Sequence, residues 1–194
     1  MSVAPYLVLI VFSAVGLILS VIGTPLAVVK NDATNACLSF YWYNTACDDS
    51  QNTLWYVELS DDSVICAGTL GLMGAGIAFT IATITTIAAA IVFSALYFPL
   101  RAWWIRVVTI SLSFSSVVLS FVTVGIAIRL YTTSLCDAAA YSTSGWTWGP
   151  TYGLFITTGV VMGLGGFVHC ILLACVSDDT VAAIDDAPKG ESAP

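Results

Sequence analysis

The residues of this 194-residue chain that are best suited to covalent chemistry are its six cysteines. They are Cys37, Cys47, Cys66, Cys136, Cys170 and Cys175. The first four are expected to lie outside the cell, and four cysteines allow three pairings. Cys37 and Cys47 enclose a short loop, and the cost of closing a loop rises with its length, so a bond between these two is favoured. Cys66 and Cys136, the other two of these four, then meet if the helices next to them pack side by side.

The other reactive side chains form no recognisable catalytic or metal-binding set. His169 is the only histidine, and without an acidic neighbour in its helix it makes neither a zinc site nor a nucleophile triad. The pairs Asp48-Asp49 and Asp61-Asp62 offer oxygen ligands to calcium but lack the spacing of a known calcium loop, which favours a solvated acidic surface. We therefore expect no enzyme activity, no cofactor and no metal.

The composition is that of a membrane protein. Hydrophobic residues make up 58% of the chain and charged residues only 9%, with a mean hydropathy of +0.94. Soluble domains carry about 25% charged residues. The net charge of −7 also argues against nucleic-acid binding, because an acidic chain does not attract the phosphate backbone. The expected partner is the lipid bilayer, and nucleic-acid binders, disordered proteins and cytosolic enzymes are excluded.

Four long charge-free runs predict four membrane-spanning helices, because about 20 apolar residues cross the hydrocarbon layer. We place the spans at about 6–28, 69–98, 107–130 and 151–176, within one membrane domain of residues 1–177. The outer loops are 30–64 and 132–151, of which the turn-rich stretch 142–150 is expected to be a loop or interface segment. Residues 178–194 are expected to form a disordered, acidic cytoplasmic tail. A signal peptide is the alternative for the first run, but the run is too long and no basic residue precedes it.

The topology follows from two arginines and from the cysteines. Arg101 and Arg106 lie in the short stretch between the second and third spans, and such stretches stay cytoplasmic. Both termini are then cytoplasmic, in a multi-pass protein of the plasma membrane. The first four cysteines fall outside, where disulfides persist, whereas the reverse topology would place them in a reducing cytosol.

The first outer loop contains two strand-like runs, Cys37–Cys47 and Thr53–Leu59. They predict a small sheet closed by a disulfide, the alternative being that their aromatic residues lie on the membrane interface. The expected fold is thus an all-α membrane protein. It consists of a left-handed bundle of four transmembrane helices with a small disulfide-stapled, β-containing extracellular domain.

The sequence of this loop resembles the amastin family, the four-span surface proteins of kinetoplastid parasites. The residues that carry the resemblance are Gly23, Thr24, Pro25, Cys37, Leu38, Ser39, Phe40, Tyr41 and Cys47. Three positions depart from the family pattern: Trp42 replaces a glycine, Asn44 a basic residue and Ala46 a polar or acidic residue. These departures are those of a divergent member. Claudins share the four-span layout but match less well, because their tryptophan ahead of the first cysteine is missing.

The resemblance implies a non-catalytic surface protein that acts in cell-surface organisation and in contact with a host or neighbouring membrane or surface protein. Amastins are described as surface glycoproteins, and since none of the asparagines in the outer loops begins an acceptor motif, any sugar here would be O-linked. A small channel or transporter subunit is the alternative function, and a claudin-like adhesion protein is the third.

Small and polar residues inside the spans predict close packing. The glycines concerned are Gly68, Gly71, Gly74, Gly76, Gly159, Gly163, Gly165 and Gly166. Packing within the bundle is the preferred interpretation, and packing between copies in a homo-oligomer is the alternative. The serines of the third span, rather than lining a pore, are expected to bond within their own helix or to a neighbour; they are Ser111, Ser113, Ser115, Ser116 and Ser120.

Cys170 and Cys175 lie near the inner end of the fourth span. The preferred interpretation is that both are small apolar side chains packed in the bundle. The alternative is S-acylation, which occurs on cysteines at this depth.

Overall fold

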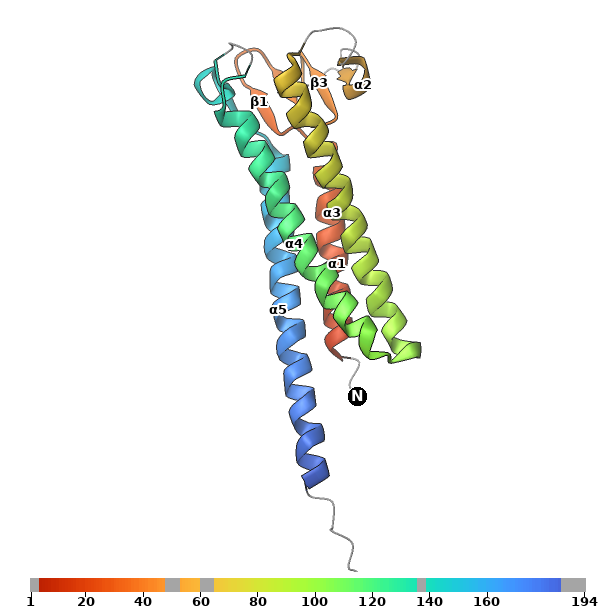
Figure 1. The fold of residues 1–194 in the computed structure, drawn as a ribbon. Coiled ribbons are helices and arrows are strands. Elements are labelled where there is room, and N and C mark those ends of the chain that lie inside the picture. Colours follow the sequence, from red (N-terminus) through yellow and green to blue (C-terminus); the bar gives the residue numbers. More distant parts are fainter. Residues whose placement is uncertain (1–3, 48–52, 60–64, 136–138, 186–194) are drawn as a thin grey trace, which may run out of the picture.

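A computed structural model describes residues 4–47, 53–59, 65–135 and 139–185, with side chains up to residue 175. Four long helices form a bundle, and a small sheet covers the end of the bundle that lies opposite the N-terminus (Figure 1). The helices are α1 (Ala4–Gly23), α3 (Ala67–Leu100), α4 (Trp103–Thr132) and α5 (Pro150–Asp185). Each contains a stretch long and apolar enough to cross a membrane. The predicted fold class, a four-span helical membrane protein with a small sheet, is confirmed.

The packing of the helices is that of a membrane bundle. α1 and α4 each pack against both α3 and α5. Large apolar side chains such as Val11, Phe114 and Phe167 face outward, with 61%, 70% and 65% of their surface exposed, whereas Ser20 and Ser116 are fully buried. Lipid solvates the large side chains, and small residues let the helix backbones approach closely, so this distribution fits a bilayer.

α3 is one continuous helix of 34 residues, which contains the predicted span 69–98. At 1.5 Å per residue it is about 50 Å long, which exceeds the hydrocarbon thickness of about 30 Å. Its first turns pack against the sheet, where Met73 belongs to the same hydrophobic core as Leu38 and Phe40. At its other end only Arg101 and Ala102 separate it from α4, so Arg106 lies in the first turn of α4 and not in a loop. Arg101 adopts a left-handed conformation, and its N–H caps α3 by donating to the Tyr97 carbonyl at 3.0 Å.

Two predicted boundaries differ from the structure. The first span was placed at 6–28, but α1 ends at Gly23, because the apolar residues that follow leave the helix and lead into a strand. Hydropathy does not distinguish a buried strand from a span. The tail was expected to be disordered from residue 178, yet α5 continues to Asp185. Extending an existing helix needs no new nucleus, and residues 177–185 contain neither glycine nor proline.

The sheet has five antiparallel strands in the order β4-β3-β2-β1-β5. Four of them come from the first outer loop, namely β1 (Val29–Asn31), β2 (Ala36–Leu38), β3 (Trp42–Asn44) and β4 (Thr53–Trp55). The fifth, β5 (Trp146–Trp148), lies in the second loop and pairs with β1. The interpretation of 142–150 as a loop or interface segment was therefore wrong for these three residues.

The second strand-like run, Thr53–Leu59, is only half strand. After β4 the chain turns into the short helix α2 (Tyr56–Leu59). The cause is local, because the Glu58 carboxylate accepts a hydrogen bond of 2.8 Å from the Trp55 N–H. A carboxylate three residues beyond a helix start that bonds back in this way is half of a capping box, and it fixes the start of the helix.

Candidate interaction site on the outer sheet

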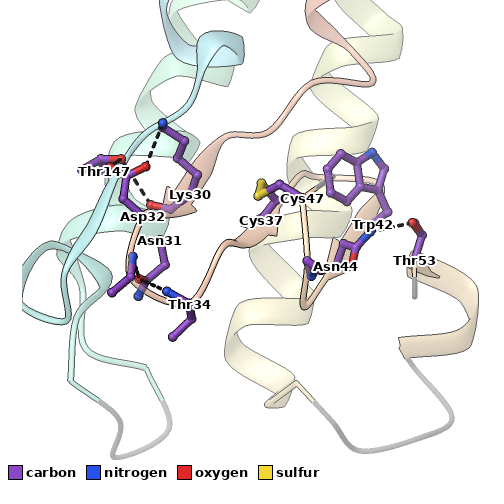
Figure 2. The surroundings of a disulfide bond; sticks show 12 residues. Lys30, Asn31, Asp32, Thr34, Cys37, Trp42, Asn44, Cys47, Thr53 and Thr147 are labelled. Atoms are coloured by element: carbon purple, nitrogen blue, oxygen red, sulfur yellow. Dashed lines mark hydrogen bonds and ion pairs between the residues drawn. A yellow bond between two sulfur atoms is a disulfide. The ribbon is translucent and has the colours of Figure 1, made fainter. Parts of the chain in front are cut away.

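A disulfide closes the hairpin formed by β2 and β3. Cys37 on β2 is bonded to Cys47, which lies beyond the end of β3, with 5.4 Å between the two Cα atoms (Figure 2). The Cys47 N–H donates at 2.6 Å to the carbonyl of Asn35, the residue just before β2. The bond therefore joins the two ends of the hairpin, and the pairing expected from loop length is confirmed.

The residues of the family-like segment point toward the bundle. Leu38 is fully buried, and Phe40, in the turn between β2 and β3, is 1% exposed. The Phe40 ring lies directly over Gly76 of α3, where a Cβ atom would overlap it. Both side chains belong to a hydrophobic core that also includes Met73 of α3 and Leu130 of α4. These motif residues fix the sheet to the helices and are not contact residues.

The second part of the motif, Gly23-Thr24-Pro25, forms the turn from α1 into the sheet. The Thr24 hydroxyl donates to the Ser20 carbonyl at 2.7 Å and ends the helix. The Pro25 carbonyl accepts a hydrogen bond of 2.9 Å from Nε1 of Trp42. Trp42 stands where the family pattern has glycine, so this departure creates a contact that ties β3 to the end of α1.

An aromatic cluster anchors β5. The Tyr131 hydroxyl donates to the Trp146 carbonyl at 3.0 Å, and the Tyr131 ring lies 4.1 Å from the Trp148 ring. Trp148 in turn stacks on Tyr152 at 4.3 Å. Next to it, a Cβ on Gly149 would overlap the Ala27 carbonyl, so only glycine fits there. The sequence reasoning missed this strand, although the alternation Trp-Thr-Trp between two glycines is a strand signal.

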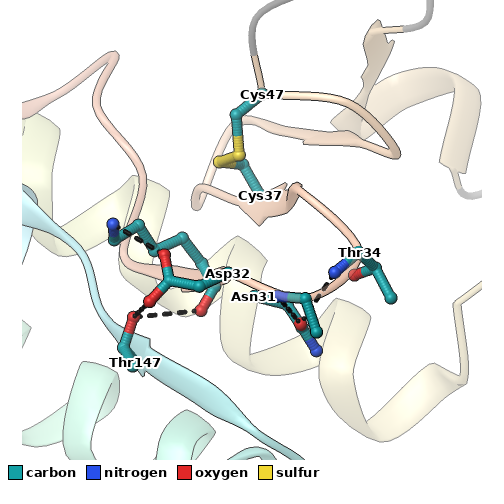
Figure 3. Close-up of polar contacts among 8 residues, drawn as sticks. Asn31, Asp32, Thr34, Cys37, Cys47 and Thr147 are labelled. Carbon is teal, nitrogen blue, oxygen red and sulfur yellow. Dashed lines mark hydrogen bonds and ion pairs between the residues drawn. A yellow bond between two sulfur atoms is a disulfide. The ribbon is translucent and has the colours of Figure 1, made fainter.

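A polar cluster holds β1 against β5 (Figure 3). Nζ of Lys30 lies 2.8 Å from Oδ1 of Asp32, and the Thr147 hydroxyl lies 3.4 Å from Oδ2 of the same carboxylate. The Asn31 side chain accepts hydrogen bonds from the N–H groups of Ala33 and Thr34, which forms the turn to β2. The hydrogen bond and the charge of Lys30 lower the pKa of Asp32 below its ordinary value of 3.8.

Burial acts in the opposite direction on two tyrosines of the outer region. It raises the pKa of Tyr41, next to the disulfide hairpin, above the ordinary value of 10.0. It also raises the pKa of Tyr141, beside β5. Both phenols therefore remain protonated at neutral pH and act only as neutral hydrogen-bonding groups.

Among the described residues of the outer region, two large apolar side chains face solvent. Trp55, at the end of β4, is 56% exposed, and Val57, in α2, is 73% exposed. β4 is the last strand in the sheet order of the described residues, and α2 follows it directly, so both side chains lie at that end of the sheet. We call these two residues the outer edge patch. An exposed tryptophan beside a second apolar side chain is the kind of surface that marks a contact site.

The remaining predicted site residues divide into three groups. Cys66 is disulfide-bonded, but its predicted partner, Cys136, lies outside the described residues, so that pairing stays a prediction. The condition for it holds, since α3 and α4 pack side by side. Cys170 and Cys175 are free and exposed. The acidic pairs lie outside the described residues, among which no group of three potential metal ligands occurs.

Some of the predicted small residues pack within the chain, whereas Gly71, with nothing within 4 Å of its Cβ position, faces open space. A Cβ on Gly159 would come within 3.2 Å of Phe121, and one on Gly165 within 2.5 Å of Phe12. Gly74 accommodates the Tyr56 side chain of the outer region. The buried serines of α4 bond back to their own helix, as in the 2.8 Å bond from the Ser120 hydroxyl to the Ser116 carbonyl. The hydroxyls of Ser113, Ser116 and Ser120 are therefore each satisfied within α4.

These features define a class: a multi-pass membrane protein whose four apolar helices support a disulfide-closed sheet. A family model described as Amastin surface glycoprotein matches residues 14–175, which include the second half of α1 and all of the sheet. The chain belongs to the amastin family and is a surface membrane protein. The comparison with curated proteins gives no match.

Proposed function

We propose that this protein acts at the plasma membrane by contact, without catalysis, in cell-surface organisation and in attachment to a host or neighbouring membrane. The outer edge patch is the contact surface. The observation that carries the proposal is the exposure of Trp55 and Val57, at 56% and 73%, on a sheet held by a disulfide. Elsewhere in the sheet, large apolar side chains such as Leu38 and Phe40 are buried.

The rigidity of the sheet supports this role. Cys37–Cys47 closes the β2–β3 hairpin, Phe40 fixes that hairpin to α3, and β4, which carries Trp55, pairs with β3, so Trp55 is presented on a strand that is already held in place. Tryptophan is among the residues that contribute most to protein contacts, since it buries a large area at low entropic cost. A surface of two side chains is too small for one tight complex in solution. It is better suited to membrane contact, where many copies bind weakly at the same time.

The proposal includes an orientation with both termini in the cytoplasm. Arg101 and Arg106, at the end of the bundle opposite the sheet, support it, as short arginine-bearing connections stay inside. The disulfide supports it as well, because such bonds persist outside the cell. Any glycan would then be attached to exposed hydroxyls of the outer region, for example those of Thr45, Thr143 or Thr147.

The test compares Trp55→Ala with Trp103→Ala in cells that express the full-length chain. Trp103 is 75% exposed but lies at the opposite end of the bundle, so it is a matched control for the loss of an exposed indole. Surface display is measured with an impermeant biotinylation reagent, and adhesion is measured on a monolayer of host cells. We expect equal display of both variants and an adhesion loss for Trp55→Ala alone.

Equal adhesion by Trp55→Ala and the parent protein would refute the patch as the contact surface. Flux through liposomes that contain the purified protein separates the proposal from a channel or transporter. A contact protein passes no ion or solute, whereas a reproducible conductance would reverse the functional assignment.

A further inference from the structure

The side chains of α2 divide between an anchored side and an exposed side. Leu59 is 1% exposed and belongs to the core under the sheet, and Tyr56 packs against the same core. Val57 and Glu58 are exposed, and so is Trp55, the last residue of β4. α2 lies at the end of the bundle opposite the N-terminus (Figure 1). The outer edge patch is therefore displayed by a segment whose other side is packed on the protein.

The patch is too small for a specific protein interface. The exposed parts of Trp55 and Val57 amount to roughly 200 Å², whereas a stable interface buries about 800 Å² on each partner. A lipid surface makes no such demand, because single apolar side chains can enter its fluid headgroup layer. Tryptophan is well suited to that layer, since its ring is apolar and its indole N–H finds polar partners there. The size and the composition of the patch thus fit a bilayer better than a folded protein.

The charge around the patch selects the kind of lipid. Residues 30–64 contain one basic residue, Lys30, and six acidic residues. Lys30 is paired with Asp32 at 2.8 Å, and the carboxylate of Glu58 lies beside the patch, where it accepts a hydrogen bond of 2.8 Å from the Trp55 N–H. An anionic bilayer attracts basic segments and repels a surface of this sign. The patch is therefore matched to zwitterionic phospholipid, which carries no net charge.

We infer that the outer edge patch binds the lipid of an opposing membrane directly, by inserting Trp55 and Val57 into a headgroup layer rich in phosphatidylcholine. The inference rests on the proposed contact function and adds its partner, a zwitterionic lipid surface in place of a protein receptor. Each copy binds weakly, and attachment comes from many copies that act at once. A second copy of the chain is a poorer partner, because both outer surfaces would carry the same negative charge.

The test uses phosphatidylcholine vesicles that contain the full-length protein, and it counts how many dock on a protein-free supported bilayer of the same lipid. We expect docking by the parent protein and by Trp103→Ala, which loses an exposed indole at the other end of the bundle. Trp55→Ala should reduce docking tenfold or more, because removing ~100 Å² of apolar surface from water changes a partition coefficient by more than tenfold. Phosphatidylserine in the bilayer should also reduce docking, and added salt should restore it.

A second measurement identifies the side chain that enters the lipid. Brominated phosphatidylcholine quenches tryptophan fluorescence at short range, and it is placed only in the target bilayer. It should quench the parent protein but not Trp55→Phe, which keeps a large aromatic side chain and should still dock. Docking that needs a protein in the target bilayer, equal docking by the parent and Trp55→Ala, or quenching that persists in Trp55→Phe would each overturn the inference.

The failure of this inference and the failure of the contact function give different results. If Trp55→Ala loses adhesion to host cells but the parent vesicles do not dock on pure lipid, the contact function stands and the lipid partner is wrong. If Trp55→Ala changes neither adhesion nor docking, both are wrong.

Discussion

The contact between Phe40 and Gly76 predicts that one side chain controls the stability of the whole outer sheet. Phe40 is 1% exposed and lies at the junction between the β2–β3 turn and α3. Replacing a buried phenylalanine by alanine costs about 3–5 kcal/mol. That corresponds to a factor of roughly 10²–10³ or more in the equilibrium between the closed and the open sheet, since about 1.4 kcal/mol is tenfold.

The assay is amide hydrogen exchange of the purified full-length protein in vesicles, followed on peptides that contain β1 and β2. Phe40→Ala should reduce the protection of these peptides by about two to three orders of magnitude. If the free energy of opening the sheet is smaller than the free energy lost in the variant, the protection should disappear. Peptides from the spans should be unchanged, because α1, α3, α4 and α5 keep their own contacts.

Phe114→Ala is the control for this prediction, because Phe114 is 70% exposed to lipid and removing it should leave the sheet protected. If Phe40→Ala leaves the protection of β1 and β2 within about threefold of the parent, the sheet is not held by this contact and the argument fails.

The remaining predictions concern the disulfide, the polar cluster and the free thiols. Cys37→Ser and Cys47→Ser should each leave membrane insertion intact and abolish surface display, because the bond contributes about 2–4 kcal/mol to a small sheet; protease protection and surface biotinylation measure the two effects. Lys30→Met should return the pKa of Asp32 to about 3.8, measured by NMR. The ionised Asp32 stabilises the native state above pH 3.8, and its contribution should disappear as the pH falls through the lowered pKa. Acyl exchange with hydroxylamine should detect a thioester on Cys175; a negative result at this exposed thiol would refute acylation there.

The helices were predictable from the sequence because a bilayer allows so few solutions. A charge-free run of sufficient length has to be helical, and all four runs are. Their ends were less predictable. Apolar residues such as Val28 and Val29 serve equally well in a span and in a buried strand, and the structure places them in the core under the sheet.

The sheet was only partly predictable, for a different reason. The bond between Cys37 and Cys47 follows from short-range chain closure, which a sequence displays directly. The pairing of Lys30 in β1 with Thr147 in β5 joins segments of two different loops. A local sequence pattern does not predict which strand pairs with β1. The same holds for Phe40 on Gly76, since a glycine in a helix does not show which ring will cover it.

The proposed function requires that the disulfide-closed sheet faces the outside of the cell. The most direct measurement is the labelling of intact cells with a membrane-impermeant thiol reagent after mild reduction, followed by peptide mapping. We expect labelling of Cys37 and Cys47, which are bonded to each other until reduced, and no labelling of Cys170 or Cys175. Labelling of Cys170 or Cys175 with Cys37 and Cys47 untouched would place the sheet in the cytoplasm and refute a contact role for it.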